Sequence, residues 1–304
     1  MKELKLQDIL NSTNDLSEQK KVGYVAIIGR PNAWKSTFIN SLLWEKISIT
    51  SNIPQTTRKR VLAIYNDDDS QIIFFDTPWI HKSNKNFNEK INKVALKSLE
   101  EADLVLNFID STREGGEEEK YIKELINEIK TPILKVYTKI DKKSKINIPK
   151  NSLKISSTTK EGFKELLEKI KEYLPKWPLL FPSDIYTKQD IFFRISEIIR
   201  EKVFLQTKEE LPHSIYVQVD EIEETKTKSQ EDLLKIVAYI YTETESQKYI
   251  IVGKNWKKIQ EIAKQARIEL EQIFDKKVFL ALRVKVRKNW RKNENFTKKL
   301  LGLK

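Results

Sequence analysis

The chain has 304 residues, enough for two domains of about 100–200 residues each. With 39% hydrophobic and 33% charged residues it has the composition of a folded protein, and no apolar run approaches the ~18 residues of a membrane span. Cysteine is absent, which excludes disulfides and a cysteine nucleophile, and the two histidines lie far apart, which excludes a zinc site. Residues 254–304 carry 16 basic and 5 acidic side chains, and this charge favours either a polyanion partner such as nucleic acid or a solvated lysine-rich surface.

From residue 22 to residue 173, strand-like apolar runs alternate with segments of helical periodicity. The expected strands are 22–28, 72–75, 104–109, 133–137 and 153–156, and the expected helices are 35–43, 87–99, 117–129 and 162–173. This alternation predicts an α/β domain with a mainly parallel sheet and helices on both faces.

A segment with three prolines, residues 174–182, separates this domain from the rest of the chain and indicates an interdomain linker. Beyond it we expect a smaller α+β domain, with helices at 191–204 and 257–274, strands at 214–219, 233–241 and 278–286, and a strand-like segment at 249–252. The predicted organisation is a polar leader at 1–20, the α/β domain at 21–174, the linker at 175–186 and the α+β domain at 187–304.

A phosphate-binding loop follows the first expected strand. The segment from Gly29 to Ser36 reads GRPNAWKS and matches the P-loop spacing, except that Trp34 stands at the second glycine. In such a loop, backbone N–H groups and a helix N-terminus form an anion site. Lys35 would add a positive charge at the β/γ-phosphates, and the Ser36 hydroxyl is a ligand for Mg²⁺.

Three further motifs follow in the order of a guanine-nucleotide site. Asp76 ends an apolar strand, which is the position of the carboxylate that holds Mg²⁺ in P-loop nucleotide hydrolases. The segment TKID at 138–141 resembles the guanine-reading motif NKxD, with Thr138 in the asparagine position, and Asp141 can accept from guanine N1–H and N2–H₂. Ser156 and Ser157 stand at the end of the next strand, where GTPases carry a Ser-Ala motif whose backbone N–H donates to guanine O6. This order favours a GTPase over the alternative, a P-loop ATPase or phosphotransferase.

Together with KISITS at 46–51, PQTTR at 54–58, LPHS at 211–214 and VKVRKNW at 284–290, these motifs resemble the Era family, bacterial Ras-like GTPases with a C-terminal KH domain. The resemblance runs from about residue 22 to residue 303. It implies GTP hydrolysis with Mg²⁺, binding of 16S ribosomal RNA, and maturation of the small ribosomal subunit. It also implies peripheral association with the inner face of the cell membrane, although no amphipathic anchor is evident. We expect a cytoplasmic monomer with no DNA partner.

The resemblance assigns roles residue by residue. Thr57 matches the switch threonine that closes on Mg²⁺. Ile80 stands where Ras-like enzymes carry a glutamine that orients the attacking water. Some Era relatives that lack this glutamine use a bound K⁺ held partly by the P-loop asparagine, and by this resemblance Asn32 is the candidate K⁺ ligand here. The segment GKNW at 253–256 resembles the GXXG loop that clamps RNA in KH domains.

The expected catalytic residues are Asn32, Lys35, Thr57 and Asp76, and the expected Mg²⁺ ligands are Ser36, Thr57 and Asp76. The expected nucleotide-binding residues are Gly29, Arg30, Pro31, Asn32, Ala33, Trp34, Lys35, Ser36, Thr37, Asp76, Thr77, Pro78, Trp79, Ile80, Thr138, Lys139, Ile140, Asp141, Ser156 and Ser157. The expected RNA-binding residues are Gly253, Lys254, Asn255, Trp256, Lys257 and Lys258.

Tryptophan repeatedly stands where the Era pattern has glycine, at the five positions Trp34, Trp44, Trp79, Trp177 and Trp256. The chain has only 7 glycines in 304 residues. Because tryptophan alone replaces glycine at all five positions, the pattern indicates that one codon is decoded differently in the source organism. We predict that the source organism reads UGA as glycine and that these five residues are glycine in the native protein. If Trp34 and Trp79 are native instead, the alternative function is an RNA-binding assembly factor with an inactive G domain.

Overall fold

The computed structural model describes residues 19–49, 60–78, 86–207 and 211–301. They form two compact units. The first comprises the described residues between 19 and 188, except Ile49 and residues 86–90, which belong to the second unit together with the described residues from 189 onward. Most of the expected leader, residues 1–18, lies outside the described residues. None of the described helices is long and apolar enough to cross a membrane.

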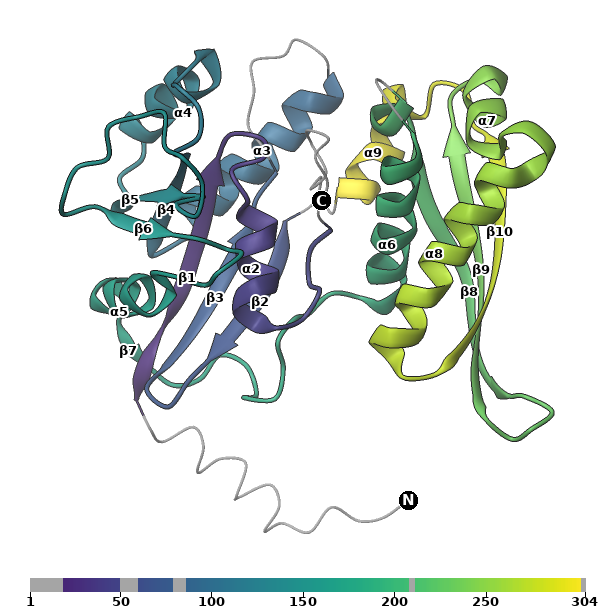
Figure 1. Cartoon of the computed structure of the whole chain (residues 1–304), viewed down its shortest axis with the longest axis horizontal. Coiled ribbons are helices and arrows are strands. Elements are labelled where there is room, and N and C mark those ends of the chain that lie inside the picture. Colours follow the sequence, from purple (N-terminus) through teal and green to yellow (C-terminus); the bar gives the residue numbers. More distant parts are fainter. Residues whose placement is uncertain (1–18, 50–59, 79–85, 208–210, 302–304) are drawn as a thin grey trace. The chain divides into compact units, whose positions relative to one another are not determined.

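The first unit is built on a seven-stranded sheet in the order β2-β3-β1-β4-β5-β6, with β7 paired to β1 (Figure 1). The strands are β1 (Lys20–Gly29), β2 (Val61–Asn66), β3 (Ser70–Asp76), β4 (Leu104–Asp110), β5 (Ile133–Thr138), β6 (Leu153–Ile155) and β7 (Lys176–Trp177). β2 and β7 run antiparallel to their neighbours, whereas β3, β1, β4, β5 and β6 are parallel to one another. The predicted mainly parallel sheet is confirmed, and β2 and β7 are strands that the sequence pattern did not indicate.

Alternation along the strands sends side chains to both faces of this sheet, and each face is covered by helices. The helices are α2 (Lys35–Leu43), α3 (Asn86–Glu100), α4 (Glu117–Asn127) and α5 (Phe163–Tyr173). On one face, the Phe38 ring of α2 lies edge-on to Phe74 of β3 and to Phe163 of α5, with ring centroids 5.8 and 5.0 Å apart. On the other face, the neighbouring β3 residues Ile73 and Phe75 share a buried cluster with residues of α3 and α4.

The proline-rich segment after α5 is not helical, and its chain is held on the first unit by a buried side chain of β3. The Gln71 amide donates to the Phe181 carbonyl at 2.8 Å and accepts from the backbone N–H groups of Leu180 and Phe181 at 2.8 and 3.0 Å. Phe181 itself is buried in the core of this unit. The segment predicted as a linker is therefore packed against the sheet over this part of its length.

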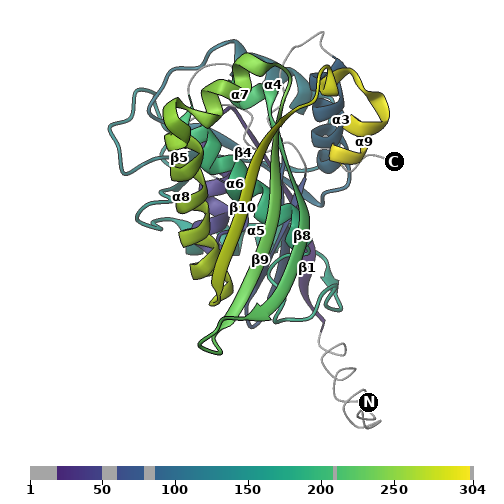
Figure 2. The same ribbon diagram turned by 90° about the vertical axis from the view of Figure 1, so that its right-hand side faces the viewer.

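The second unit is a three-stranded sheet with two helices packed on one face (Figure 2). Its elements are α6 (Ile191–Gln206), β8 (Tyr216–Lys226), β9 (Asp232–Thr242), α7 (Glu245–Val252), α8 (Lys257–Phe274), β10 (Lys277–Val286) and α9 (Glu294–Leu301). β9 is central; it pairs antiparallel with β8 and parallel with β10. Buried aliphatic residues of α6, α8 and the sheet form one core. The predicted smaller α+β domain is confirmed, and α9 is an additional helix.

The strand-like reading of residues 249–252 is wrong, because these residues form the end of helix α7. A capping box starts this helix: the Thr244 hydroxyl accepts from the Gln247 N–H at 3.3 Å, and the Gln247 side chain accepts from the Thr244 N–H at 3.2 Å. The apolar run Tyr-Ile-Ile-Val is β-prone in isolation, but the N-terminal cap fixes the helix.

Candidate functional site

The phosphate-binding loop lies between β1 and α2. Gly29 ends β1 where a side chain would not fit, since a Cβ there would stand 2.7 Å from the Phe108 carbonyl oxygen of β4. Trp34 precedes the first turn of α2 with φ 62° and ψ 31°, and its carbonyl accepts the Phe38 N–H at 2.9 Å. Because the first N–H groups of a helix have no partner within the helix, the loop presents donors where a phosphate would bind.

Lys35 folds back over this loop. Its ammonium donates to the carbonyls of Gly29 and Arg30 at 3.0 and 3.2 Å. Burial lowers the pKa of Lys35 to about 8, although the negative charge of Asp76 acts to raise it. Burial thus disfavours the charged form of Lys35, and an anion in the loop would stabilise it.

The two described residues expected to hold Mg²⁺ meet directly. The Ser36 hydroxyl donates to the Asp76 carboxylate at 2.7 Å, and Asp76 is fully buried at the end of β3. Next to it, the Thr77 hydroxyl donates to the Ile27 carbonyl at 2.6 Å, which holds the end of β3 against β1. A hydroxyl and a carboxylate at this separation are the hard oxygen ligands that Mg²⁺ prefers. Thr57, the third expected ligand, lies outside the described residues, as do Trp79 and Ile80.

The base-reading residues lie at the ends of β5 and β6. The Asp141 carboxylate is exposed and accepts from the Ser156 hydroxyl at 2.6 Å. Ser156 in turn accepts from the N–H groups of Thr158 and Thr159 at 3.2 and 3.1 Å, so the turn after β6 fixes its position. The Ser157 carbonyl accepts from the Ser41 hydroxyl of α2 at 2.8 Å, which ties this turn to the helix of the P-loop. Asp141 is thus oriented before any ligand binds.

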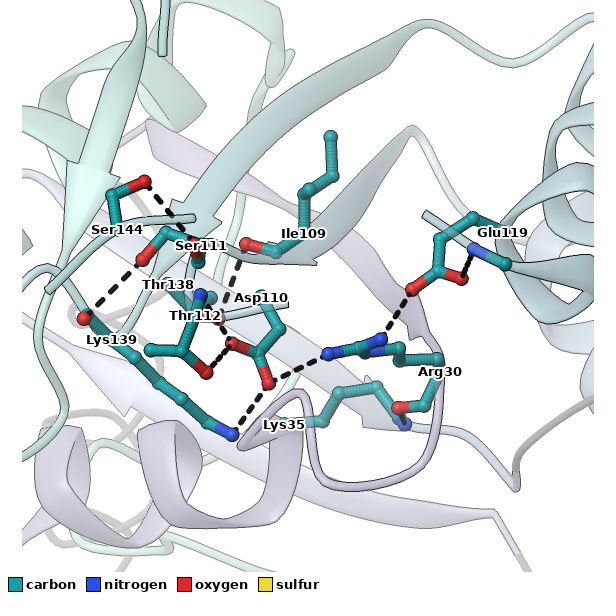
Figure 3. Close-up of polar contacts among 11 residues, drawn as sticks. Arg30, Lys35, Ile109, Asp110, Ser111, Thr112, Glu119, Thr138, Lys139 and Ser144 are labelled. Atoms are coloured by element: carbon teal, nitrogen blue, oxygen red, sulfur yellow. Dashed lines mark hydrogen bonds and ion pairs between the residues drawn. The ribbon is translucent and has the colours of Figure 1, made fainter. Parts of the chain in front are cut away.

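A buried ion cluster, which the sequence motifs did not indicate, lies between these two loops (Figure 3). Asp110, the last residue of β4, is 3.0 Å from the Arg30 guanidinium of the P-loop and 2.6 Å from the Lys139 ammonium of the base-reading loop. Arg30 also pairs with Glu119 of α4 at 2.9 Å. Burial alone would raise the pKa of Asp110, but hydrogen bonds from Lys139, Thr112 and Arg30 lower it to about 2. The only available sequence signal was a carboxylate at the end of a buried strand.

Three of the five tryptophans at glycine positions have a left-handed backbone. The φ values are 62° at Trp34, 56° at Trp44 and 64° at Trp256, in a region where an L-residue costs about 1–2 kcal/mol. Trp177 lies in strand β7 instead, and Trp79 lies outside the described residues. The Trp34 indole lies 5.2 and 4.8 Å from the ammonium groups of Lys139 and Lys142, so it extends toward the base-reading loop.

The expected RNA-binding loop joins α7 to α8. Gly253 has φ 72° and ψ 170°, and a Cβ there would stand 2.7 Å from the Cβ of Lys258. Asn255 and Trp256 both have positive φ, and α8 begins at Lys257. Lys254, Asn255, Trp256 and Lys257 are exposed, and 66% of the Trp256 surface is accessible. A tight loop between two helices with an exposed backbone and adjacent lysines is the arrangement that binds a nucleic-acid backbone in KH domains.

The fold and the two sites define a P-loop GTPase joined to a KH domain. The family described as "50S ribosome-binding GTPase" matches residues 24–139, and the KH domain family matches residues 210–291. The chain is 44% identical to GTPase Era of Treponema denticola, over 91% of its own length and 98% of the relative, and 44% identical to GTPase Era of Borrelia garinii, over 93% and 100%. The chain therefore belongs to the Era family of GTPases.

Solved structures of the family have the same fold over nearly the whole chain. An Aquifex aeolicus Era variant bound to GDP and AlF₄⁻ is 37% identical, covers 93% of this chain and 99% of its own, and superposes with a TM-score of 0.84. A structure of Era in complex with MgGDPNP and nucleotides 1506–1542 of 16S ribosomal RNA is also 37% identical, with the same coverage and a TM-score of 0.85. The family thus uses a guanine nucleotide with Mg²⁺.

Proposed function

We propose that this chain binds GTP in the loop from Gly29 to Thr37 and hydrolyses it. The observation that carries the proposal is that Lys35, the Ser36–Asp76 pair and the Asp141–Ser156 pair all lie at the carboxyl end of one parallel sheet, where open α/β sheets bind ligands. Lys35 contacts the β/γ-phosphates, Ser36 and Asp76 hold Mg²⁺ together with Thr57, and Asp141 accepts from the guanine edge. Bound Mg²⁺ supplies positive charge to the phosphates during hydrolysis.

Guanine recognition has a direct test. Titration of the protein with glycine at 34 and 79 with fluorescent GDP and ADP should show at least a tenfold preference for GDP, about 1.4 kcal/mol, because adenine lacks the N1–H and N2–H₂ donors that Asp141 accepts. Asp141→Asn should abolish this preference. Equal affinity of this glycine-containing protein for GDP and ADP would contradict the guanine assignment.

The second part of the proposal is that the KH domain binds 16S ribosomal RNA and that GTP controls this binding during maturation of the small subunit. The relative solved with nucleotides 1506–1542 of this RNA supports it, as do the exposed lysines around Gly253 and the net charge of +11 after residue 253. Residues 253–258 hold the RNA backbone. The protein acts as a monomer in the cytoplasm. Binding of a single-stranded RNA of the same sequence, measured with GDP and with a non-hydrolysable GTP analogue, tests the coupling.

The third part concerns the cation in hydrolysis. Ile80 has no group that orients water, so a second cation beside the phosphates would supply the missing transition-state charge. Ser36 is assigned to Mg²⁺, and Asn32 is a P-loop side chain with a further oxygen to hold K⁺. Hydrolysis by the protein with glycine at 34 and 79 should be faster in K⁺ than in Na⁺ at equal ionic strength. Asn32→Val should remove this advantage, and an unchanged rate ratio in that variant would exclude Asn32 as the K⁺ ligand.

The proposal includes glycine as the native residue at positions 34, 44, 79, 177 and 256. Positive φ at three of these positions supports it. The intact mass of the native protein, or the codons themselves, decides it, and UGG codons at the five positions would contradict it. In that case the second candidate function, an RNA-binding factor with an inactive G domain, is favoured by the Trp34 indole beside Lys139.

A further inference from the structure

We propose that Asp110 is a positioning residue for the nucleotide, holding Lys139 of the base-reading loop in a fixed place beside Arg30 of the P-loop. The inference rests on the proposed nucleotide site. It assigns a role to the end of β4, a segment that none of the sequence motifs includes.

The two carboxylate oxygens of Asp110 have separate partners (Figure 3). Oδ1 accepts from the N–H and the hydroxyl of Thr112 at 2.9 and 2.6 Å, which fixes the plane of the carboxylate. Oδ2 is left to face the two cations, 3.0 Å from Arg30 and 2.6 Å from Lys139. The side chains of Asp110 and Arg30 are only 1% and 2% exposed, so these ion pairs are little screened by solvent.

The backbone around Asp110 holds the same loop. Asp110 and Thr138 are register partners in the β4–β5 ladder. The Thr138 hydroxyl donates to the Ile109 carbonyl at 3.3 Å, and the Ser111 N–H donates to the Thr138 carbonyl at 3.2 Å. Further along, the Ser111 carbonyl accepts from the Lys145 N–H at 2.8 Å and from the Ser144 hydroxyl at 3.2 Å. The end of β4 is therefore attached to both ends of the base-reading loop, and Asp110 extends this attachment to the P-loop.

Removing the charge of Asp110 has a defined consequence. An amide in place of the carboxylate would leave Arg30 and Lys139 adjacent in a buried place, and a buried ion pair that loses one partner is strongly unfavourable. Arg30 keeps its pair with Glu119, so Lys139 is the cation that must move toward solvent. The aliphatic stem of Lys139 would then no longer cover the base, and the base-reading loop would lose its attachment to the P-loop.

The test uses the full chain carrying Trp34→Gly, because the indole beside Lys139 would obscure the effect. In this background Asp110→Asn should weaken GDP binding at least tenfold. The matched control is Asp103→Asn, which makes the same change beside the opposite end of β4, where Asp103 accepts from the Tyr24 N–H at 2.7 Å. This control should bind GDP within twofold of the reference.

A double-mutant cycle separates positioning from general stability. If Asp110 acts through Lys139, Asp110→Asn should change GDP affinity less than threefold in a Lys139→Met background, whereas a structural loss would persist there. Hydrogen exchange of the nucleotide-free chain should accelerate over residues 138–146 in Asp110→Asn and stay unchanged in Asp103→Asn.

Unchanged GDP affinity and unchanged exchange in Asp110→Asn would overturn the inference. So would a full tenfold loss in the Lys139→Met background. If the reference binds no GDP even with glycine at both 34 and 79, the proposed function fails, and the exchange measurement still decides whether Asp110 holds the loop.

Discussion

Among the described residues, the two loops that we propose to bind phosphate, one in each unit, both lead into the N-terminus of a helix and share one backbone feature. Trp34 and Trp256 each precede a helix with a left-handed backbone, with φ 62° and 64°. The surroundings differ. In the first loop Ala33 is buried and Arg30 is 2% exposed, whereas in the second Lys254 and the residues up to Lys257 are exposed.

This difference separates two ways of binding phosphate. The P-loop follows β1 and contacts Asp76 at the end of β3 and Asp110 at the end of β4, so we expect its affinity to depend on a few oriented charges. The KH loop is open, so its affinity depends on the number of lysines near the RNA backbone and on salt. A single substitution in the first loop should therefore change nucleotide affinity strongly. In the second loop, each removed lysine should weaken RNA affinity by a similar amount, and these losses should add.

The largest effect is expected at the enclosed loop. Trp34→Gly should convert a protein with no GDP binding below about 1 mM into one that binds at about 1 µM or tighter, at least 1,000-fold, or about 4 kcal/mol. Isothermal titration calorimetry measures the change. Trp34→Ala is the control that removes the indole but keeps a Cβ at positive φ, and it should recover only part of the affinity. Micromolar GDP binding by the chain with Trp34 would show that the loop tolerates the indole.

At the open loop, the effect should follow charge. Replacing Lys254, Lys257 and Lys258 with alanine removes about 0.7 per phosphate contact from the slope of log K against log salt, about two in total. Affinity for single-stranded RNA at 0.1 M salt should then fall roughly 100-fold, and equally for all sequences. Filter binding over a salt series measures both quantities. A loss confined to one RNA sequence would mean that these lysines read bases, and the two loops would then differ less than proposed.

The contrast also explains what the sequence could predict. Asp141 and Ser156 were expected in the base site from separate motifs, and the structure joins them at 2.6 Å because parallel strands end at one edge. Asp110 could not be predicted, because its role depends on the register that places it beside Thr138 and on a long arginine from the loop after β1. Helix α7 was missed because its cap outweighs a β-prone run. Local motifs thus indicated the residues expected to contact the nucleotide, whereas the residues that hold those side chains in place depend on tertiary structure.

The pH dependence of nucleotide binding tests whether the enclosed loop depends on one oriented charge. The pKa of Lys35 is lowered from 10.5 to about 8, so above pH 8 the free protein loses the ammonium that attracts phosphate. GDP affinity of the Trp34→Gly protein should be constant below pH 7 and about tenfold weaker at pH 9, measured by fluorescence titration. Lys35→Arg, whose guanidinium stays charged, should bind more weakly but without this decline. A flat profile with lysine in place would mean that burial does not control this charge.

The smallest expected effect tests the cost of positive φ at a position outside both proposed ligand sites. Trp44 directly follows α2 with φ 56° and is 82% exposed, and it is not among the residues expected to bind nucleotide or RNA. A left-handed residue after a helix is the position that glycine stabilises most, so Trp44→Gly should raise the free energy of unfolding by about 1 kcal/mol. Trp177→Gly is the matched control: Trp177 is 57% exposed but lies in strand β7, where its φ is not positive and glycine costs about 0.5–1 kcal/mol. Urea unfolding of the two variants should therefore move the midpoint in opposite directions. If both substitutions destabilise the chain, the positive φ of Trp44 does not reduce the free energy of unfolding. Positive φ would then no longer support glycine as the native residue at positions 34 and 256.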